Sequence, residues 1–317
     1  MHTPRLARTL FVALSLLAGQ GPVSAAAAPP PRVVVSIAPV HGLVAAVMVG
    51  VGSAVLLLPA GASPHAHALR PSQLHELEHA SLVIWVGEAL EPYLARALAA
   101  PVSGRRALAL MDAPQLRVWP ARSGGLLHGD AAPPPAQAAG RHAHAQADPH
   151  LWLEPHNARA IVALAARELS AIDVANAQRY ADNAAQATSR IDALEREIAA
   201  RLRPLRDAPY VVFHDAYQGF EKSFGLNPVA VVTVVPGRAP GARRLAAIRE
   251  RIVASGARCV FAEPQFEPRL IGTIIEGTGA RSGVLDPQGA AITPGPDAWF
   301  ELMRALSEGL YACLSVR

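Results

Sequence analysis

Short runs of β-branched and aliphatic residues alternate, in the first third of the chain, with longer stretches that have helical spacing. Because such runs suit strands that are buried on both faces, they predict strands that alternate with helices. The predicted strands are Arg32–Ile37, Val55–Leu58, Leu82–Val86 and Ala107–Leu110, and the predicted helices are Pro39–Val49, Pro71–Glu78 and Glu91–Ala99. This alternation is typical of an α/β lobe with a mainly parallel sheet.

The last third of the chain repeats this rhythm. Its predicted strands are Tyr210–Phe213, Val229–Val235, Cys259–Ala262 and Val284–Leu285, and its predicted helices are Ala216–Phe224, Pro240–Ala254, Glu267–Thr278 and Asp297–Leu314. We therefore expect a second α/β lobe built like the first.

A long helix is predicted between the lobes, after an alanine-rich helix over Pro155–Ile172. Val174 to Arg203 contains neither Gly nor Pro, and as a helix it would extend over roughly 45 Å. Its apolar residues recur at helical spacing, at Ile191, Leu194, Ile198 and Leu202. The predicted fold class is α/β, with two lobes that each hold a mainly parallel four-stranded sheet and are joined by one long rigid helix. The predicted division is 26–173 for the first lobe, 174–204 for the linking helix and 205–317 for the second lobe.

The first 25 residues have the features of a secretory signal. Arg5 and Arg8 precede the apolar stretch Leu10–Ala18, and Val23-Ser24-Ala25 fits a small-residue cleavage site. The apolar stretch is too short to span a bilayer. We expect cleavage near Ala25 and a mature protein in the periplasm, with a retained anchor as the alternative. The residue directly after the cleavage site is Ala26 and not a cysteine, which argues against lipid attachment there.

The composition is that of a protein with a sizeable core. The chain has 317 residues, of which 51% are hydrophobic and 17% charged, and its formal net charge is +4. Its arginines are spread along the chain without a basic run interleaved with aromatic residues, so we expect no nucleic-acid partner.

Cys259 and Cys313 are the two cysteines of the chain. In an oxidising compartment an even pair suggests one disulfide, and two buried thiols are the alternative.

The segment Asp112–Ala147 breaks the α/β pattern. It is rich in Ala, Pro and Gly and carries His128, His142 and His144. Such a composition cannot bury much apolar surface, so it predicts a mobile loop. The three histidines could form a second, weak metal site, and a solvated linker is the alternative.

Four candidate metal ligands follow predicted strands. His65 follows the second strand, His150 the fourth strand and the loop, His214 the first strand of the second lobe, and Asp286 its last strand. Ligands of open α/β sheets bind beyond the carboxyl ends of the strands, so these side chains would converge if the lobes face each other. Three nitrogens and one oxygen suit tetrahedral zinc. Taken singly, each histidine could instead be a capping or core residue.

Several segments carry a resemblance to a known family. They are Leu58-Pro59-Ala60-Gly61-Ala62-Ser63-Pro64-His65, Leu69-Arg70-Pro71-Ser72, Asp148-Pro149-His150-Leu151-Trp152-Leu153, Phe213-His214-Asp215-Ala216-Tyr217, Phe261-Ala262-Glu263-Pro264-Gln265-Phe266 and Leu285-Asp286-Pro287. In this order they resemble the zinc-binding subunits of bacterial ABC zinc importers, the ZnuA-type solute-binding proteins of metal-binding cluster A-I. The resemblance covers essentially the whole mature chain.

The resemblance implies a metal ion between two lobes and a membrane permease of the ABC type as partner. His65, His150 and His214 match the family's three histidine ligands, and Asp286 matches a fourth position that a carboxylate or water can fill. Manganese-binding relatives carry Glu at the place of His214, so this residue favours zinc. The resemblance also implies a Cys259–Cys313 disulfide. The loop departs from the family pattern, because zinc-binding members often have long histidine-dense runs there.

Two other interpretations stay open. His75-Glu76-Leu77-Glu78-His79 fits the H-E-x-x-H pattern of zinc proteases. However, the predicted helix is short and places His79 at its end, so an exposed, charged helical face is the simpler interpretation. A manganese-binding or adhesin-like member of the same scaffold is the other alternative. The sequence favours a monomeric, non-enzymatic periplasmic protein that binds Zn²⁺ and delivers it to a permease in the inner membrane.

Overall fold

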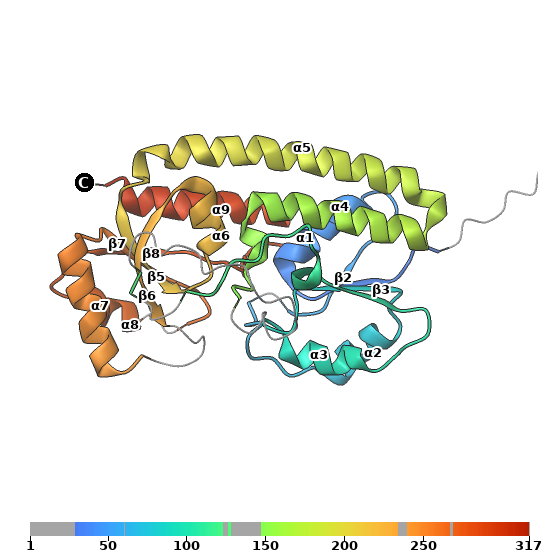
Figure 1. Ribbon diagram of the computed structural model, residues 1–317, viewed down its shortest axis with the longest axis horizontal. Coiled ribbons are helices and arrows are strands. Elements are labelled where there is room, and N and C mark those ends of the chain that lie inside the picture. The colour runs from blue at the N-terminus through green and yellow to red at the C-terminus, as the bar shows by residue number, and fades with distance from the viewer. Residues whose placement is uncertain are drawn as a thin grey trace, which may run out of the picture.

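The structure is a computed structural model, and it describes residues 29–59, 61–122, 126–127, 147–233, 240–266 and 269–316. The predicted signal peptide and His128, His142 and His144 lie outside the described residues. In the part that is described, two lobes lie side by side under a layer of long helices (Figure 1). No helix in this part is both long enough and apolar enough to cross a membrane.

The first lobe contains a parallel four-stranded sheet, as predicted. Its strands, in the spatial order β2-β1-β3-β4, are Val55–Leu56, Val33–Val35, Leu82–Trp85 and Arg106–Ala109. Helices α1 (Ala38–Met48), α2 (Pro71–Glu78) and α3 (Pro92–Ala99) connect them. Proline stands in the first turn of each helix, where its missing N–H is not needed.

The second lobe repeats this topology. Its strands, in the spatial order β6-β5-β7-β8, are Asn227–Thr233, Pro209–His214, Cys259–Ala262 and Arg281–Val284, all parallel. Helices α6 (Gln218–Phe224), α7 (Ala242–Ser255) and α8 (Arg269–Ile275) belong to this lobe. The prediction for the last strand was wrong in its bounds, because β8 begins three residues earlier, at Arg281. This edge strand, Arg-Ser-Gly-Val, has no apolar run that could have revealed it.

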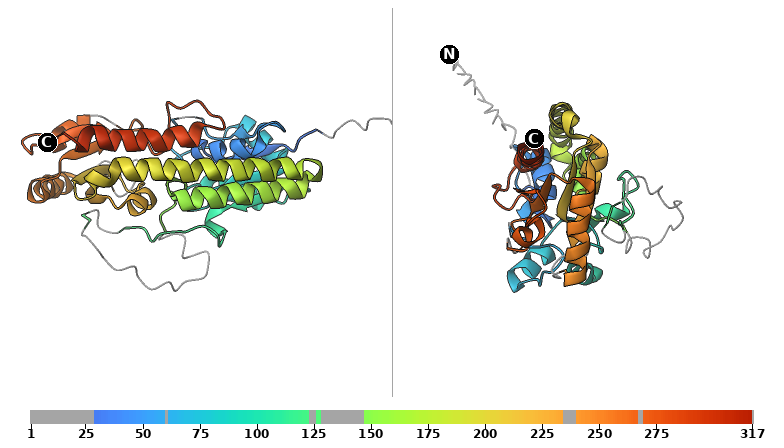
Figure 2. Two further views of the ribbon diagram at one scale, coloured as in Figure 1. Left: turned by 90° about the horizontal axis from the view of Figure 1, so that it is seen from above. Right: turned by 90° about the vertical axis from the view of Figure 1, so that its left-hand side faces the viewer.

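Three long helices and α1 form the layer above both sheets. They are α4 (Pro155–Ile172), α5 (Ala177–Leu202) and α9 (Ala298–Leu314), which run side by side (Figure 2). Helix α5 lies over both lobes, and short 3₁₀ turns, Val174–Asn176 and Arg203–Leu205, flank it. The single long helix between two lobes is therefore confirmed. The division at residues 173 and 204 stays a prediction, since α1 of the first lobe packs against α9 of the second.

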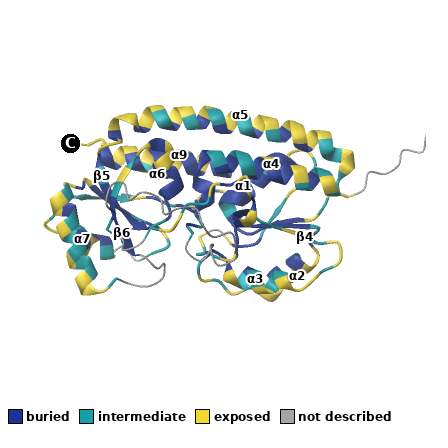
Figure 3. Cartoon of the chain, viewed as in Figure 1, coloured by how far each residue is buried: buried dark blue, intermediate teal, exposed yellow. Residues whose placement is uncertain are grey.

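One hydrophobic core extends through both lobes beneath this layer. It includes Val35 and Ile84 of the first sheet and Val212 and Phe261 of the second, together with the buried faces of α1, α4, α5 and α9 (Figure 3). A buried side chain, Asn183 on α5, donates hydrogen bonds to the backbone oxygens of Val47 and Val49. Because the lobes share this core, they are held in a defined relative position.

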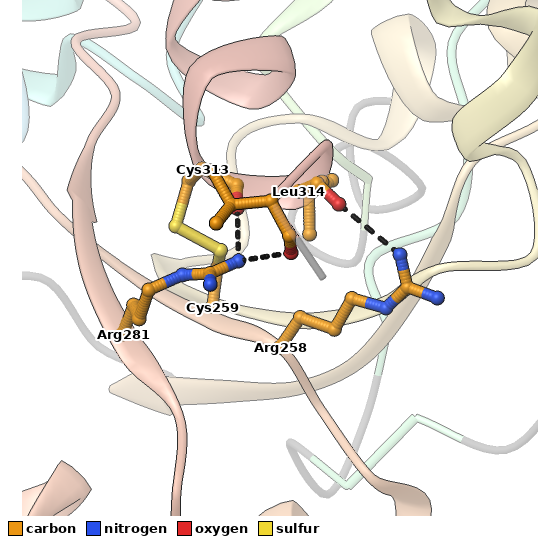
Figure 4. The surroundings of a disulfide bond; sticks show 6 residues. Arg258, Cys259, Arg281, Cys313 and Leu314 are labelled. Carbon is orange, nitrogen blue, oxygen red and sulfur yellow. Dashed lines mark hydrogen bonds between the residues drawn. A yellow bond between two sulfur atoms is a disulfide. The ribbon is translucent and has the colours of Figure 1, made fainter.

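A disulfide ties the second sheet to the helical layer. Cys259 of β7 is bonded to Cys313 of α9, with their Cα atoms 6.2 Å apart (Figure 4). Beside it, the Arg281 guanidinium donates to the Cys313 carbonyl at 2.7 Å, and Arg258 donates to the Leu314 carbonyl at 3.1 Å. The predicted disulfide is confirmed, and it anchors the end of the last helix.

Candidate metal centre

Three of the predicted ligands meet between the lobes. The Nε2 atom of His150 lies 3.2 Å from Nε2 of His65 and 3.3 Å from Nε2 of His214. The ligand atoms of these three histidines all lie within 4.8 Å of one another. Nitrogens bound to one tetrahedral zinc ion at 2.0–2.1 Å would be about 3.3 Å apart. The two Nε2 distances in this structure are therefore close to those that a zinc ion requires.

His150 and His214 are positioned by the ends of regular elements, and His65 is positioned by turns. His214 is the last residue of β5, and His65 belongs to the turns after β2. His150 directly precedes the 3₁₀ helix Leu151–Leu153, and its backbone N–H donates to Asp148 Oδ1 at 3.0 Å. The side chains of His150 and His214 are buried, and that of His65 is half-buried. The site is thus fixed on both lobes and reached by solvent at His65.

Two buried carboxylates orient the two buried imidazoles. Nδ1 of His150 lies 2.8 Å from Asp148 Oδ1, and Nδ1 of His214 lies 2.7 Å from Glu263 Oε1. With Nδ1–H donating to a carboxylate, the lone pair on each Nε2 faces the site. Glu263 also accepts a hydrogen bond from the Tyr217 hydroxyl at 3.1 Å. The carboxylates therefore prepare the rings to bind a cation.

Asp148 and Glu263 had no predicted role in the metal site. A signal for Glu263 was available, because this residue directly follows β7. Strand β7 pairs with β5 in parallel, so their carboxyl ends reach the same edge of the sheet. Applying the strand-end rule to every acidic residue, and not only to candidate ligands, would have placed Glu263 beside His214.

The charges around the site set the protonation of the ligands. Burial, together with repulsion from His150 and His214, lowers the pKa of His65 to about 2, so this imidazole stays neutral. Burial alone would lower the pKa of His214, but the charge and hydrogen bond of Glu263 raise it above its ordinary value. Burial likewise opposes the charge on Asp148, but hydrogen bonds and charge from His150 lower the pKa of that carboxyl. At His214, protons therefore compete with a metal ion at a pH above the ordinary range of an imidazole.

Asp286, the fourth predicted ligand, lies in the turn after β8 and is not part of the group of three histidines. Its Oδ1 accepts hydrogen bonds from the Gln265 side chain at 2.8 Å and from the Gln288 backbone at 2.9 Å. Its Oδ2 accepts one from the Ala290 backbone at 2.6 Å. The described residues thus bring three nitrogen ligands together and hold the Asp286 carboxylate in its own turn.

The first part of the segment predicted as a mobile loop, residues 112–122, makes contacts with the second lobe, and the mobility of the segment stays a prediction. Arg122 donates to Asp215 Oδ1 at 2.9 Å and forms an ion pair with Glu221 at 2.8 Å. A little further on, the Leu127 backbone N–H donates to Val229 of β6 at 3.0 Å. The segment carries a half-buried arginine to the second lobe, where it pairs with the residue after His214. An isolated arginine in an Ala/Pro/Gly-rich stretch gave no sign of this contact.

A second group of candidate ligands lies on α2. His75, Glu78 and His79 are exposed, and their ligand atoms lie within 4.8 Å of one another. These residues belong to the H-E-x-x-H match, but α2 has only eight residues. Glu76, which would be the general base of a protease, instead accepts a hydrogen bond from Arg32 Nε at 3.1 Å. This arrangement does not support the protease interpretation.

Comparisons with known proteins show which family the chain belongs to. The model of the family named ZnuA, zinc-uptake complex component A, periplasmic, matches residues 33–313. The chain belongs to this ZnuA family. A relative in Brucella suis biovar 1 (strain 1330), the high-affinity zinc uptake system protein ZnuA, is 39% identical over 329 residues. That alignment covers 97% of this chain and 98% of the relative.

Solved structures share the fold of this family. A crystal structure of ZnuA superimposes with a TM-score of 0.74 at 22% identity, covering 90% of this chain and 99% of that one. The laminin-binding protein of Streptococcus agalactiae, described as bifunctional with adhesin and metal-transporting activity, superimposes with a TM-score of 0.75 at 23% identity. It covers 90% of this chain and 99% of its own. At such identities the likeness establishes the two-lobed fold.

Proposed function

We propose that this protein captures Zn²⁺ between its lobes and delivers it to an ABC-type permease in the inner membrane. The observation that supports this most strongly is the meeting of three Nε2 atoms, from His65, His150 and His214, at 3.2 and 3.3 Å. The family is one of periplasmic zinc-uptake components, and its zinc-named relative aligns with nearly the whole chain.

The ligand chemistry favours zinc over manganese. Imidazole nitrogens suit zinc, whereas manganese prefers carboxylate, carbonyl and water oxygens. The carboxylates closest to the imidazoles, Asp148 and Glu263, bind Nδ1 atoms and so act through the histidines. The fourth position is filled by Asp286 or by water. Among the described residues, Oδ2 of Asp286 accepts one hydrogen bond, from the Ala290 backbone, so it retains a lone pair for an ion.

The site binds its ion without covalent chemistry, so the protein is not an enzyme. A hydrolytic zinc site needs a general base beside a metal-bound water. Asp148 and Glu263 already accept Nδ1–H hydrogen bonds, and Tyr217 donates its hydroxyl to Glu263.

The protein functions as a monomer in the periplasm after removal of a signal peptide near Ala25. Mass spectrometry of the exported protein, together with its mass in solution, tests these two points.

Release to the permease requires the two sides of the site to separate slightly. His65 and His150 belong to the first lobe and His214 to the second, so a small lobe movement lengthens metal–ligand bonds. The shared core restricts such a movement to small amplitudes. Cross-linking the lobes close to the site should therefore block delivery and leave binding intact.

The structure offers a pair of positions for this cross-link. A Cβ atom built on Gly61 would lie 3.6 Å from the Cβ atom of Ala290, within the range of a disulfide. The φ of +80° at Gly61 makes a cysteine there unfavourable by about 1–2 kcal/mol. Gly61→Cys combined with Ala290→Cys should bind one zinc ion when oxidised and support no zinc uptake through the permease. Uptake should return on mild reduction. Each single variant is a control, and full uptake by the oxidised, cross-linked protein would contradict the release step.

We further propose that His128, His142 and His144 bind a second zinc ion weakly. Three imidazoles on a loop must be ordered to chelate, and fixing each residue costs about 1–2 kcal/mol. The site between the lobes is built by folding and should bind far more tightly. Deleting residues 128–146 should therefore keep the tight site and remove a weak ion. Loss of the tight site on calorimetric titration, with the circular dichroism spectrum unchanged, would show instead that the loop supplies a ligand.

A further inference from the structure

Helix α2 presents a group of metal-ligating side chains outside the interlobe site. His75 and His79 are four residues apart, so they lie on one face of the helix. Their ring centroids are 4.1 Å apart. Glu78 brings a carboxylate oxygen to within 4.8 Å of both imidazole ligand atoms. Modest side-chain rotations would bring all three groups into contact with one ion.

One of these imidazoles is already oriented for binding. Nδ1 of His79 lies 2.8 Å from the backbone oxygen of His75, to which it donates its hydrogen. The Nε2 atom of His79 then carries the free lone pair. A backbone carbonyl on the second nitrogen is a common way to fix a metal-binding histidine. His79 thus meets the same requirement as His150 and His214, with a carbonyl in place of a carboxylate.

The surroundings of the group also favour a cation. Glu78 is the last residue of α2 and His79 caps it, so the group lies at the carbonyl end of the helix, where positive charge is stabilised. The opposite side of α2 is anchored to the lobe by buried Leu77 and by Gln73, which donates to the Leu57 carbonyl at 2.6 Å. The group therefore sits on a fixed support and faces solvent.

We propose that His75, Glu78 and His79 form a second site, on the surface, for a divalent transition metal ion of the Zn²⁺ type. Two imidazoles and one carboxylate are zinc ligands, and water would complete the shell. The site is independent of the interlobe site and binds more weakly, because its exposed side chains lose rotamer freedom on binding. The H-E-x-x-H sequence thus contributes its two histidines to a binding site in which Glu78 is the acidic ligand, while Glu76 pairs with Arg32.

Calorimetric titration of the chelated full-length protein with ZnCl₂ tests this site. His128, His142 and His144 are first replaced by Ala so that they cannot contribute a weak ion. We expect this protein to bind one zinc ion tightly and a second weakly. Adding His75→Ala and His79→Ala should remove the weak ion and leave the tight one. His156→Ala, which removes an imidazole outside both groups, should leave both. A weak ion that persists without His75 and His79 would overturn the proposal.

A position-resolved readout separates this site from the interlobe one. Zinc should protect His75 and His79 from acylation by diethyl pyrocarbonate, and Glu78→Gln should reduce that protection. Equal acylation of both histidines with and without saturating zinc would contradict the proposal. In a His150→Ala background the weak ion and the protection should remain. If the parent protein showed only the weak ion, and it depended on His75 and His79, the interlobe assignment would fail while the surface site would stand.

Discussion

Glu263 accepts a hydrogen bond from Nδ1 of His214 at 2.7 Å, which joins the carboxyl ends of the neighbouring parallel strands β7 and β5. Glu263 is the residue after β7 and His214 is the last residue of β5. Both side chains are buried. The contact fixes the ring so that Nε2 faces His150, and it raises the pKa of His214. A structural contact between two strands thereby also sets the competition between protons and metal.

Glu263→Gln should change both the strength and the pH dependence of zinc binding. Loss of a partner on the second nitrogen of a ligand typically weakens metal binding about 10–100-fold. The pKa of His214 is raised, so this ring takes up a proton at a higher pH than an ordinary histidine. The zinc affinity of the parent protein should therefore fall as the pH drops through that raised pKa. Without the carboxylate the decline should move to lower pH. Competition with a fluorescent chelator between pH 5 and 8 measures both effects, and an unchanged pH profile would contradict this role.

The His214–Glu263 pair should stabilise the zinc-free protein more at low pH than at high pH, whereas low pH weakens zinc binding. A histidine whose folded pKa is raised stabilises fully below its unfolded pKa of about 6.5, and that contribution is lost as pH rises through the folded pKa. The difference in free energy of unfolding between the parent and Glu263→Gln should therefore be larger at pH 5.5 than at pH 9. Urea unfolding of the metal-free proteins at the two pH values tests this sign.

Replacing His65, His150 or His214 singly by Ala should remove most of the zinc affinity. Each substitution deletes one of the three nitrogens that meet at the site. A ligand that binds only the folded state adds RT ln(1 + [L]/Kd), about 4 kcal/mol at 1,000 times Kd, so zinc should raise the melting temperature of the parent. The same low zinc concentration should stabilise the three variants little. His75→Ala serves as the control, and loss of tight binding there with retention in His150→Ala would mean that the site is misplaced.

Arg122→Ala should destabilise the protein strongly. It would leave Asp215 and the buried carboxylate of Glu221 without their arginine partner. Removing one partner of a fully buried pair typically costs about 3–5 kcal/mol, and the partial exposure of Arg122 and Asp215 puts the expected cost at the lower end of that range. Arg106→Ala, which removes an exposed partner of Glu168, should cost about 0–1 kcal/mol. Chemical denaturation of the two variants measures the contrast, and equal costs would show that the Arg122 contact contributes little.

Reduction of the Cys259–Cys313 disulfide should lower stability and leave zinc binding unchanged. The two cysteines are 54 residues apart in sequence. A cross-link that closes a loop of this length contributes about 4 kcal/mol in the chain-entropy model. The bond lies between β7 and α9, and neither cysteine belongs to the group of three histidines. Thermal unfolding and zinc stoichiometry, measured with and without reductant, check both parts, and a lost zinc ion would contradict the separation of the two features.

Most helices and strands could be predicted because each is marked by a pattern in its own short stretch of sequence. Buried parallel strands gave apolar runs, and prolines in the first turn marked where α2 and α4 begin, so both helices have the predicted bounds. Strand β8 was misplaced because an edge strand with the sequence Arg-Ser-Gly-Val lacks an apolar pattern. The strand order, the helical layer shared by both lobes and the core that runs through them depend on contacts between distant segments.

The site could be predicted in part for the same reason. The three histidines were found because each follows a strand or precedes a helix, at the sheet edge where ligands bind. The orienting carboxylates and the Arg122 contact were missed, since they depend on pairing between distant segments, such as β5 with β7. Asp286 remains a predicted ligand, whose carboxylate is engaged by Gln265 and two backbone N–H groups.

The most direct test is competitive loading of the chelated, full-length protein with equal concentrations of Zn²⁺ and Mn²⁺, followed by dialysis and measurement of metal content. The protein should retain one zinc ion per chain and no manganese, because three imidazoles form the site. His150→Ala in parallel should retain neither ion tightly. Retention of manganese in preference to zinc, or of one tight zinc ion by the His150→Ala variant, would contradict the proposed zinc centre.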